Sequence, residues 1–344
     1  MTTSERTSVA QTCAQERETL DRRGWAARLL SVLRGFDASI RGHHRTRPES
    51  RPDGADALAP LLDEVPAQAD ATPEVVPIFD APPASTARPS ISEETVFYKQ
   101  TSRQTLHMTI VRPAGSDPAS GRPCVLFFHG GGWRRGTPQQ FLPYCRLLAE
   151  HGIVGGSAEY RLLEREEDEI PVEAVSDARS AMRWIRSHAT HFGIDPARIG
   201  AAGGSSGAHL AAMTALKSPV DDVADDLSID PRPAALVLMN PPCDFDAFAS
   251  SVPIAERRLY SPYHLVDDSL PPTLMLHGTA DRVIPFSQIT EFQLRARSVG
   301  ARQLKVVPFE GRGHGFFNRG KGEPGDYMRI AVEIGNFLGG LGWM

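Results

Sequence analysis

Hydrophobic residues fall into short continuous runs along the chain from about residue 92 onward. Several of these runs are rich in Val, Ile, Leu or Phe, as expected for strands that are buried on both faces of a sheet. Buried strands of this kind predict a sheet that helices cover on both sides. We predict strands at residues 105–112, 123–128, 152–158, 198–203, 234–240, 272–277 and 304–309.

Between these runs, apolar residues recur at the spacing of a helix. One predicted helix begins near Pro171, another carries Pro138 in its first turn, and a third covers residues 207–217. Strands that alternate with helices imply a parallel sheet with right-handed crossovers. The apolar faces of the first two helices are formed by Val175, Ala178, Met182 and Ile185, and by Leu142, Cys145, Leu148 and Ala149.

Residues 1–90 have a different composition, and we predict that they are an N-terminal extension of a domain covering residues 91–344. From Arg47 to Ser90 the chain is rich in Pro, Ala and Asp without a sustained period, so we expect a largely disordered linker. Apolar residues at helical spacing before the linker indicate one short amphipathic helix, either frayed or docked on the main domain, a partner or a membrane surface. These residues are Trp25, Leu29, Leu30, Leu33 and Phe36.

Composition narrows the classes of partner. The 344 residues carry a net charge of −5 and a pI near 6.1, which argues against a nucleic-acid partner. The four cysteines, Cys13, Cys124, Cys145 and Cys243, follow no metal-binding or CxxC spacing, so reduced thiols fit better than a disulfide framework. No apolar run has the length of a signal-peptide core at the start or of a membrane span, so we expect a cytoplasmic protein.

The first chemical signal is a Gly-x-Ser-x-Gly pattern formed by Gly203, Ser205 and Gly207, between a predicted strand and a predicted helix. A serine hydroxyl needs a base to take its proton, so it must stand exposed where a histidine can reach it. A sharp turn achieves this, but it forces the residues two positions before and after the serine to be small. Ser206 also follows a glycine by two positions, but its second following neighbour is Ala208, so we prefer Ser205 as the nucleophile.

The second signal is the sequence His-Gly-Gly-Gly-Trp, which begins at His129 and follows an apolar strand. Three consecutive glycines let backbone N–H groups turn inward without side chains in the way. Donors that are fixed before the reaction stabilise a tetrahedral oxyanion by about 3 kcal/mol each. We expect His129 to brace this loop by hydrogen bonds. The predicted oxyanion-hole donors are the N–H groups of Gly130, Gly131, Gly132 and Ser206.

Two loops near the C-terminus each follow an apolar strand and carry one candidate partner for the serine. Asp281 lies in the first loop and His314 in the second, so the chain order is Ser, Asp, His. His314 would take the proton of Ser205 and return it to the leaving group, while Asp281 would hold the other ring nitrogen. Asp244 and Asp246 are a second candidate pair for the acid. We prefer Asp281, because the acid loop must neighbour the histidine loop.

Four motifs in this order, HGGGW, GGSSGAHLA, HGTADRVIPFSQ and GRGHGFFN, resemble those of the serine carboxylesterases of the α/β-hydrolase superfamily. The sequence is most similar to the acetyl-xylan and feruloyl-esterase-like branch, beside the hormone-sensitive-lipase-type esterases. The resemblance covers residues 95–344 and implies an α/β fold with an eight-stranded, mostly parallel sheet flanked by helices. The active site is then expected at the carboxyl edge of the strands.

The resemblance also implies a carboxylic-ester hydrolase that works through an acyl-enzyme and needs no metal or cofactor. The insertion at residues 243–271 is short for a lid, so we expect a shallow pocket for short acyl groups of acetylated sugars or small-molecule esters. We assign Trp133, Tyr160 and Phe316 to this pocket. Three alternatives stay open: a prolyl-oligopeptidase-type peptidase, an arylformamidase-type amidase, and a hydrolase-fold binding protein without catalysis.

Overall fold

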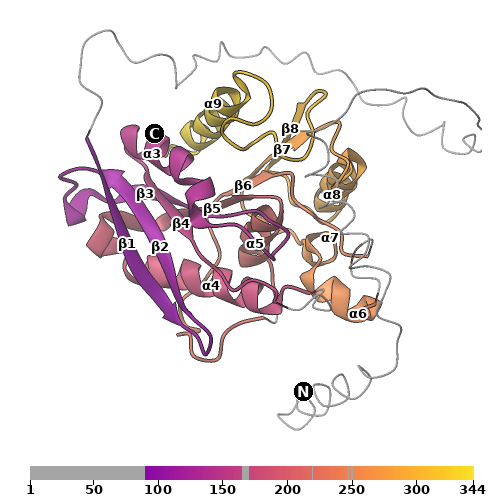
Figure 1. The fold of residues 1–344 in the computed structure, drawn as a ribbon, viewed down its shortest axis with the longest axis horizontal. Helices are drawn as coiled ribbons and strands as arrows, with labels where there is room; N and C mark the ends of the chain where they lie inside the picture. The colour runs from indigo at the N-terminus through magenta and orange to yellow at the C-terminus, as the bar shows by residue number, and fades with distance from the viewer. Residues whose placement is uncertain (1–89, 165–169, 219, 247, 249–250) are drawn as a thin grey trace, which may run out of the picture.

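One eight-stranded sheet with helices on both faces dominates the computed structural model (Figure 1). The structure describes residues 90–164, 170–218, 220–246, 248 and 251–344. The predicted linker up to residue 89 and the predicted helix around Trp25–Phe36 lie outside the described residues. In spatial order the strands are β1 (Ile91–Gln100), β2 (Thr105–Pro113), β4 (Val154–Ala158), β3 (Arg122–Phe128), β5 (Ile194–Gly204), β6 (Leu236–Met239), β7 (Thr273–Gly278) and β8 (Leu304–Phe309).

The sheet is mostly parallel, as expected from the alternation of strands and helices. β1 pairs antiparallel with β2, and β2 pairs antiparallel with β4, whereas the pairings from β4 through β8 are all parallel. The seven predicted runs coincide with β2 to β8, with small differences at the ends. β1 carries no predicted run because Tyr98 is the one buried side chain in it, and Phe97 faces solvent.

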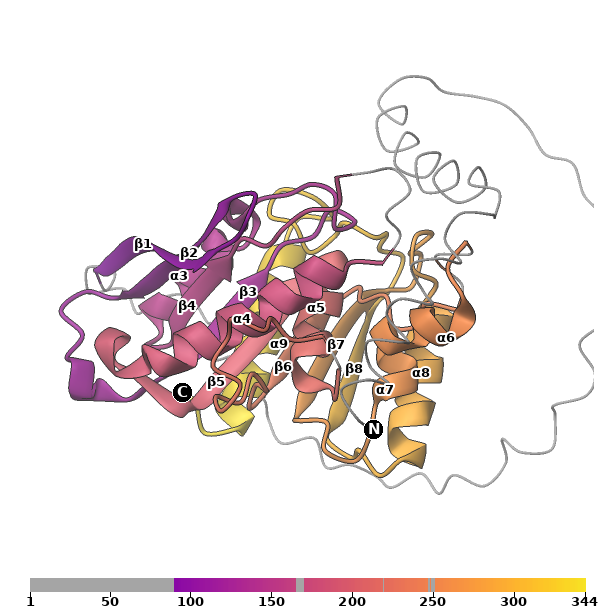
Figure 2. The ribbon, with the colours of Figure 1, turned by 90° about the horizontal axis from the view of Figure 1, so that it is seen from below.

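Helices form a layer on each face of the sheet (Figure 2). α3 (Leu142–Glu150) and α9 (Asp326–Gly340) cover one face, and α4 (Val172–Ser187), α5 (Ser206–Ala215) and α8 (Phe286–Ser298) cover the other. The insertion after β6 forms the short helices α6 (Ile254–Arg257) and α7 (Pro262–Leu265). Single 3-10 turns are η2 (Pro118–Ser120), η3 (Pro138–Gln140), η4 (Ala189–Phe192) and η5 (Arg258–Tyr260).

The predicted helix near Pro171 is α4, and the one at 207–217 is α5. The prediction for Pro138 is wrong: it begins the separate turn η3, and the first turn of α3 holds Pro143 instead. The apolar face predicted for α4 is buried against the sheet, where each large side chain contributes roughly 1.5–3 kcal/mol relative to an exposed position. That face comprises Val175, Ala178, Met182 and Ile185, all 0% exposed.

The parallel strands end together at one edge of the sheet, and this alignment positions the site. Loops that leave β3, β5, β7 and β8 at this edge carry the glycine loop, Ser205, Asp281 and His314 respectively. Residues far apart in the sequence are therefore neighbours, as the switch-point rule predicts. The register pairs Phe128 with Gly203, Gly204 with Met239, Met239 with Leu276, and Gly278 with Phe309.

Candidate active site

Ser205 lies at the sharp turn between β5 and α5, with φ 55° and ψ −125°. A non-glycine residue rarely adopts such a conformation, which costs about 1–3 kcal/mol and is typical of functional sites. Neighbouring glycines make the turn possible. A Cβ on Gly207 would lie 2.0 Å from the carbonyl oxygen of Phe128, and one on Gly203 would lie 2.4 Å from the backbone of Gly207. The turn leaves Ser205 partly exposed.

A continuous chain of hydrogen bonds joins Ser205, His314 and Asp281. The Oγ of Ser205 lies 2.7 Å from Nε2 of His314, and Nδ1 of His314 lies 2.7 Å from Oδ2 of Asp281. Because a carboxylate only accepts, Nδ1 carries the ring proton and Nε2 is left to accept from the serine hydroxyl. This tautomer is the one that a general base for the serine requires.

Asp281 is held as a buried carboxylate. Its side chain is fully buried, and its Oδ1 accepts the backbone N–H groups of Val283 at 2.8 Å and Ile284 at 3.0 Å. Burial by itself would raise the pKa of Asp281, but the hydrogen bond and charge of His314 and the two backbone donors outweigh it and lower the pKa below its usual value. Asp281 is therefore ionised at neutral pH and can stabilise a positive charge on His314.

The structure separates the two candidate serines. Ser206 is only 1% exposed at the start of α5, so its hydroxyl is shielded from a substrate. Ser205 is the serine whose hydroxyl contacts His314. This arrangement favours the register in which Gly203 and Gly207 flank the nucleophile.

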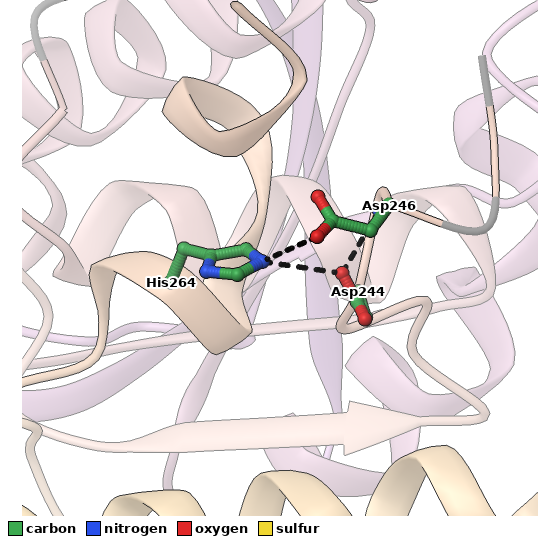
Figure 3. Close-up of side chains that lie close together, drawn as sticks. All are labelled: Asp244, Asp246 and His264. Carbon is green, nitrogen blue, oxygen red and sulfur yellow. Dashed lines mark hydrogen bonds and ion pairs between the residues drawn. The ribbon is translucent and has the colours of Figure 1, made fainter. Parts of the chain in front are cut away.

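Asp244 and Asp246, the second candidate acids, face His264 (Figure 3). The Nε2 of His264 lies 3.3 Å from Oδ2 of Asp246 and 3.6 Å from Oδ1 of Asp244. Although carboxylates and imidazoles are metal ligands, Arg258 already pairs with the same Oδ2 of Asp246 at 2.8 Å and lowers the pKa of that carboxyl. We therefore interpret this group as an ion-pair network of the insertion, and Asp281 remains the preferred acid.

The glycine loop after β3 lies directly against the serine turn, because a Cβ on Gly130 would lie 3.4 Å from Cβ of Ser205. The N–H of Gly130 already donates to Oε1 of Gln140 at 2.6 Å. The prediction that Gly130 is an oxyanion donor is therefore corrected. Gly131 and Gly132 have φ values of 126° and 64°, in the region that favours glycine. The candidate donors that remain are the N–H groups of Gly131, Gly132 and Ser206.

His129 braces this loop, as expected. Its Nδ1 donates to the carbonyl oxygen of Gly130 at 3.0 Å. Because the C=O and N–H of a trans peptide point in opposite directions, this bond turns the N–H of Gly131 away from the imidazole. The hydroxyl of Tyr160 donates to the carbonyl oxygen of His129 at 2.7 Å. The Tyr160 ring stacks on the imidazole of His129, with 4.2 Å between the ring centroids. Tyr160 is 2% exposed and supports the loop, so its assignment to the pocket is corrected.

The other two residues assigned to the pocket are also buried. Phe316 is 2% exposed and packs on Phe309 at 4.5 Å, in the core beneath α3 and α9, so its assignment is corrected as well. Trp133 is 5% exposed and lies edge-on to His209 at 5.2 Å and near Phe245 at 5.6 Å. These contacts place Trp133 between α5 and the insertion after β6, so it stays a predicted part of the pocket wall.

Two polar residues of this site were not predicted. Asn240 donates to Asp281, and Gln140 joins the glycine loop to Asn318, which follows His314 in the chain. Asn240 had a signal: it is a polar residue at the end of an apolar strand, of a type that tolerates positive φ, before two prolines. Gln140 had no signal, because the adjacent Gln139 is the same residue type.

Comparisons with known proteins show which family this chain belongs to. A family model described as BD-FAE matches residues 108–252. Thermogutta terrifontis esterase 2, in its form phosphoramylated by tabun, has a similar structure, with a TM-score of 0.69 and 37% sequence identity. That similarity covers 73% of this chain and 96% of the other. The chain belongs to the α/β-hydrolase carboxylesterases.

The chain also resembles curated proteins of Mycobacterium tuberculosis. It is 29% identical to esterase LipC over 222 residues, which are 58% of this chain and 54% of LipC. It is 26% identical over 249 residues to LipM, described as a probable carboxylic ester hydrolase, covering 66% of this chain and 57% of LipM. The chain thus spans about half the length of the curated relatives it matches. Within the described ranges, no helix is long and apolar enough to cross a membrane.

Proposed function

We propose that this chain hydrolyses carboxylic esters through an acyl-enzyme on Ser205. The observation that carries the proposal is the unbroken chain of two 2.7 Å contacts from Ser205 through His314 to Asp281. The buried, ionised Asp281 favours the protonated form that His314 reaches during the reaction. The strained backbone of Ser205 supports the same assignment, since strain of this kind concentrates at reacting residues.

In the proposed mechanism, Ser205 Oγ attacks the ester carbonyl carbon while its proton passes to Nε2 of His314. The oxyanion that forms would accept hydrogen bonds from the N–H groups of Gly131, Gly132 and Ser206. Collapse of this intermediate releases the alcohol, which takes the proton from His314. A water molecule then repeats the sequence on the acyl-enzyme and releases the carboxylic acid.

Short acyl groups are the proposed substrates, on acetylated sugars or small-molecule esters. Thermogutta terrifontis esterase 2 has been described bound to propionate and bound to butyrate, which supports a small acyl site in this family. In this chain Phe245, which belongs to the insertion after β6, is buried beside Trp133. We infer that these two rings limit the depth of the acyl pocket.

We propose that residues 91–344 are the catalytic domain and that residues 1–90 are an extension of it. Ser205, His314 and Asp281 supply the nucleophile, base and acid for this mechanism without a metal or cofactor. A cytoplasmic location fits Cys124, Cys145 and Cys243, which are free and buried.

The proposal is tested with p-nitrophenyl esters from acetate to decanoate, using the wild-type chain and Ser205→Ala. We expect acetate and butyrate esters to be cleaved fastest and the activity to vanish in the variant. A proline anilide and N-formylkynurenine, assayed in parallel, identify the peptidase and amidase alternatives. A wild-type protein that cleaves an amide but no ester, or cleaves nothing, would contradict the proposal.

A further inference from the structure

Asn240 occupies a strained position between the strand ends of the site. It directly follows β6 and has φ 48°, one of three non-glycine residues with positive φ in the described part of the chain. Its backbone N–H donates to the carbonyl oxygen of Leu276 at 3.0 Å, which continues the β6–β7 ladder past the end of β6. The residue before it, Met239, accepts the N–H of Ser205 at 2.8 Å. Asn240 is therefore tied by its backbone to the strands that carry the nucleophile and the acid.

The side chain of Asn240 is fully buried, and each of its polar atoms has a partner. Nδ2 lies 2.7 Å from Oδ2 of Asp281 and 2.9 Å from the carbonyl oxygen of His314, and Oδ1 accepts the N–H of Gly278 at 3.3 Å. Asp281 Oδ2 and the His314 carbonyl can only accept, so the nitrogen must face them. The two amide hydrogens thus bind the acid side chain and the backbone of the base residue.

We propose that Asn240 is a positioning residue that holds Asp281 and the His314 loop at hydrogen-bonding distance from each other. The inference rests on the proposed roles of these two residues. The Oδ2 atom of Asp281 receives both Asn240 and His314, so the amide fixes the side-chain torsion of the carboxylate that orients the imidazole. The Nε2 of His277 on β7 lies 3.5 Å from the same oxygen. This Nε2 donates its proton to the carbonyl oxygen of Ile284 at 2.9 Å, so His277 does not hold the carboxylate.

Because Asn240 has a positive φ, substitutions can distinguish the role of its side-chain amide from the role of its backbone in the turn. Glycine adopts positive φ without cost, so Asn240→Gly keeps or relaxes the backbone and removes only the amide. Aspartate has nearly the same shape as asparagine and also tolerates this conformation. However, Asn240→Asp replaces two donors by an acceptor and sets a second carboxylate against Asp281.

The positioning role predicts an order of activity that a role in the turn alone does not. We expect kcat with p-nitrophenyl acetate to fall about 100-fold in Asn240→Gly, because small misplacements of reacting groups cost about this much. KM should change little. The thermal midpoint should fall, because the variant leaves the N–H of Gly278 and the carbonyl oxygen of His314 unpaired, so kcat is measured well below that midpoint. Asn240→Asp should be less active than Asn240→Gly. The added carboxylate faces Asp281, His314 and His277, so the acid limb of its kcat/KM profile should move to higher pH.

Two results would overturn the proposal: an Asn240→Asp variant with wild-type kcat and pH profile, or an Asn240→Gly variant with wild-type kcat. If Asn240→Asp does not fold, Asn240→Gly carries the test alone, with its fold verified by circular dichroism. Ser205→Ala is assayed beside both variants. Ester cleavage that survives in Ser205→Ala would refute the proposed function itself, a result that the Asn240 variants cannot produce.

Discussion

The side-chain amides of Gln140 and Asn318 meet at 2.6 Å between Nε2 and Oδ1. Gln140 uses its oxygen to hold the N–H of Gly130, and Asn318 uses its nitrogen to hold the carbonyl oxygen of Gly315 at 2.9 Å. Each amide therefore has one orientation that satisfies both of its partners. The pair connects the loop proposed to bind the oxyanion to the loop that carries His314.

Breaking this connection should slow the reaction without unfolding the chain. Gln140→Met keeps the length of the side chain but removes both hydrogen bonds, so the glycine loop loses its fixed position. Because removal of a whole oxyanion donor costs roughly 100- to 1,000-fold in kcat, we expect displacement of the loop to cost about tenfold. Steady-state kinetics measure this loss, with exposed Gln139→Met as the matched control. Equal kcat values for the two variants would contradict the prediction.

The serine turn should tolerate no side chain at Gly207. A Cβ there would lie 2.0 Å from the carbonyl oxygen of Phe128, which is backbone of a central strand and cannot move away. Gly207→Ala should therefore lower the free energy of unfolding by about 3 kcal/mol, measured by urea denaturation. Gly340→Ala is the control, since a Cβ at that position in α9 would meet no atom within 4 Å beyond its chain neighbours and the backbone of its own helix. It should leave stability unchanged or raise it by up to about 1 kcal/mol.

A buried ion-pair network should stabilise the first strand. Asp177 in α4 is fully buried and accepts from Lys99 of β1 at 2.8 Å and from Arg161 at 2.7 Å. Asp177→Ala would remove the one fully buried acid of the network and leave Lys99 only with Asp222 and Arg161 only with Glu173, so it should cost about 3 kcal/mol of unfolding free energy. The control is the surface pair of Lys217 with Asp267, where Lys217→Ala should leave the free energy of unfolding almost unchanged. Similar losses in the two variants would be evidence against the network.

Two buried histidines should destabilise the fold in acid. Burial lowers the pKa of His129 and of His209 from 6.5 to about 4. Between these values the unfolded chain binds protons that the folded chain does not, so stability should fall as the pH drops from about 6.5 to about 4. His209→Gln preserves a donor for the carbonyl of Tyr260, which His209 Nε2 contacts at 2.8 Å, but does not titrate.

Urea denaturation at several pH values checks this prediction. The stability of His209→Gln should depend less steeply on pH, by at most about 1.4 kcal/mol per pH unit within the window. His191→Gln, at an exposed position, should retain the wild-type slope. A wild-type slope in His209→Gln would contradict the assignment.

The sheet could be predicted from the sequence because seven of its strands, the edge strand β8 included, read as apolar runs. β1 could not, since half of its side chains are exposed, Phe97 among them, and only Tyr98 is buried. Pro138 misled the prediction for α3 because proline suits the start of a 3-10 turn as well as that of a helix.

The candidate site also has residues that could be predicted from the sequence and residues that could not. Ser205, Asp281 and His314 could be assigned because sharp turns after strands restrict the residue types that fit there. The positions of Tyr160 and Phe316 could not be predicted, because burial depends on which layer covers a ring: Phe316 packs beneath α9 rather than at the site edge. Gln140 and Asn240 act through distances between loops far apart in the chain. Only the three-dimensional structure brings those loops together.

Ser205 as the nucleophile is tested most directly by mapping where paraoxon modifies the chain, since paraoxon phosphorylates Thermogutta terrifontis esterase 2. The wild-type chain, Ser205→Ala and Ser206→Ala are treated with paraoxon, digested and analysed by peptide mass spectrometry. We expect one diethylphosphoryl group on Ser205 in the wild type and in Ser206→Ala, and none in Ser205→Ala. Modification of Ser206, or ester hydrolysis that continues after Ser205 is fully modified, would contradict this assignment.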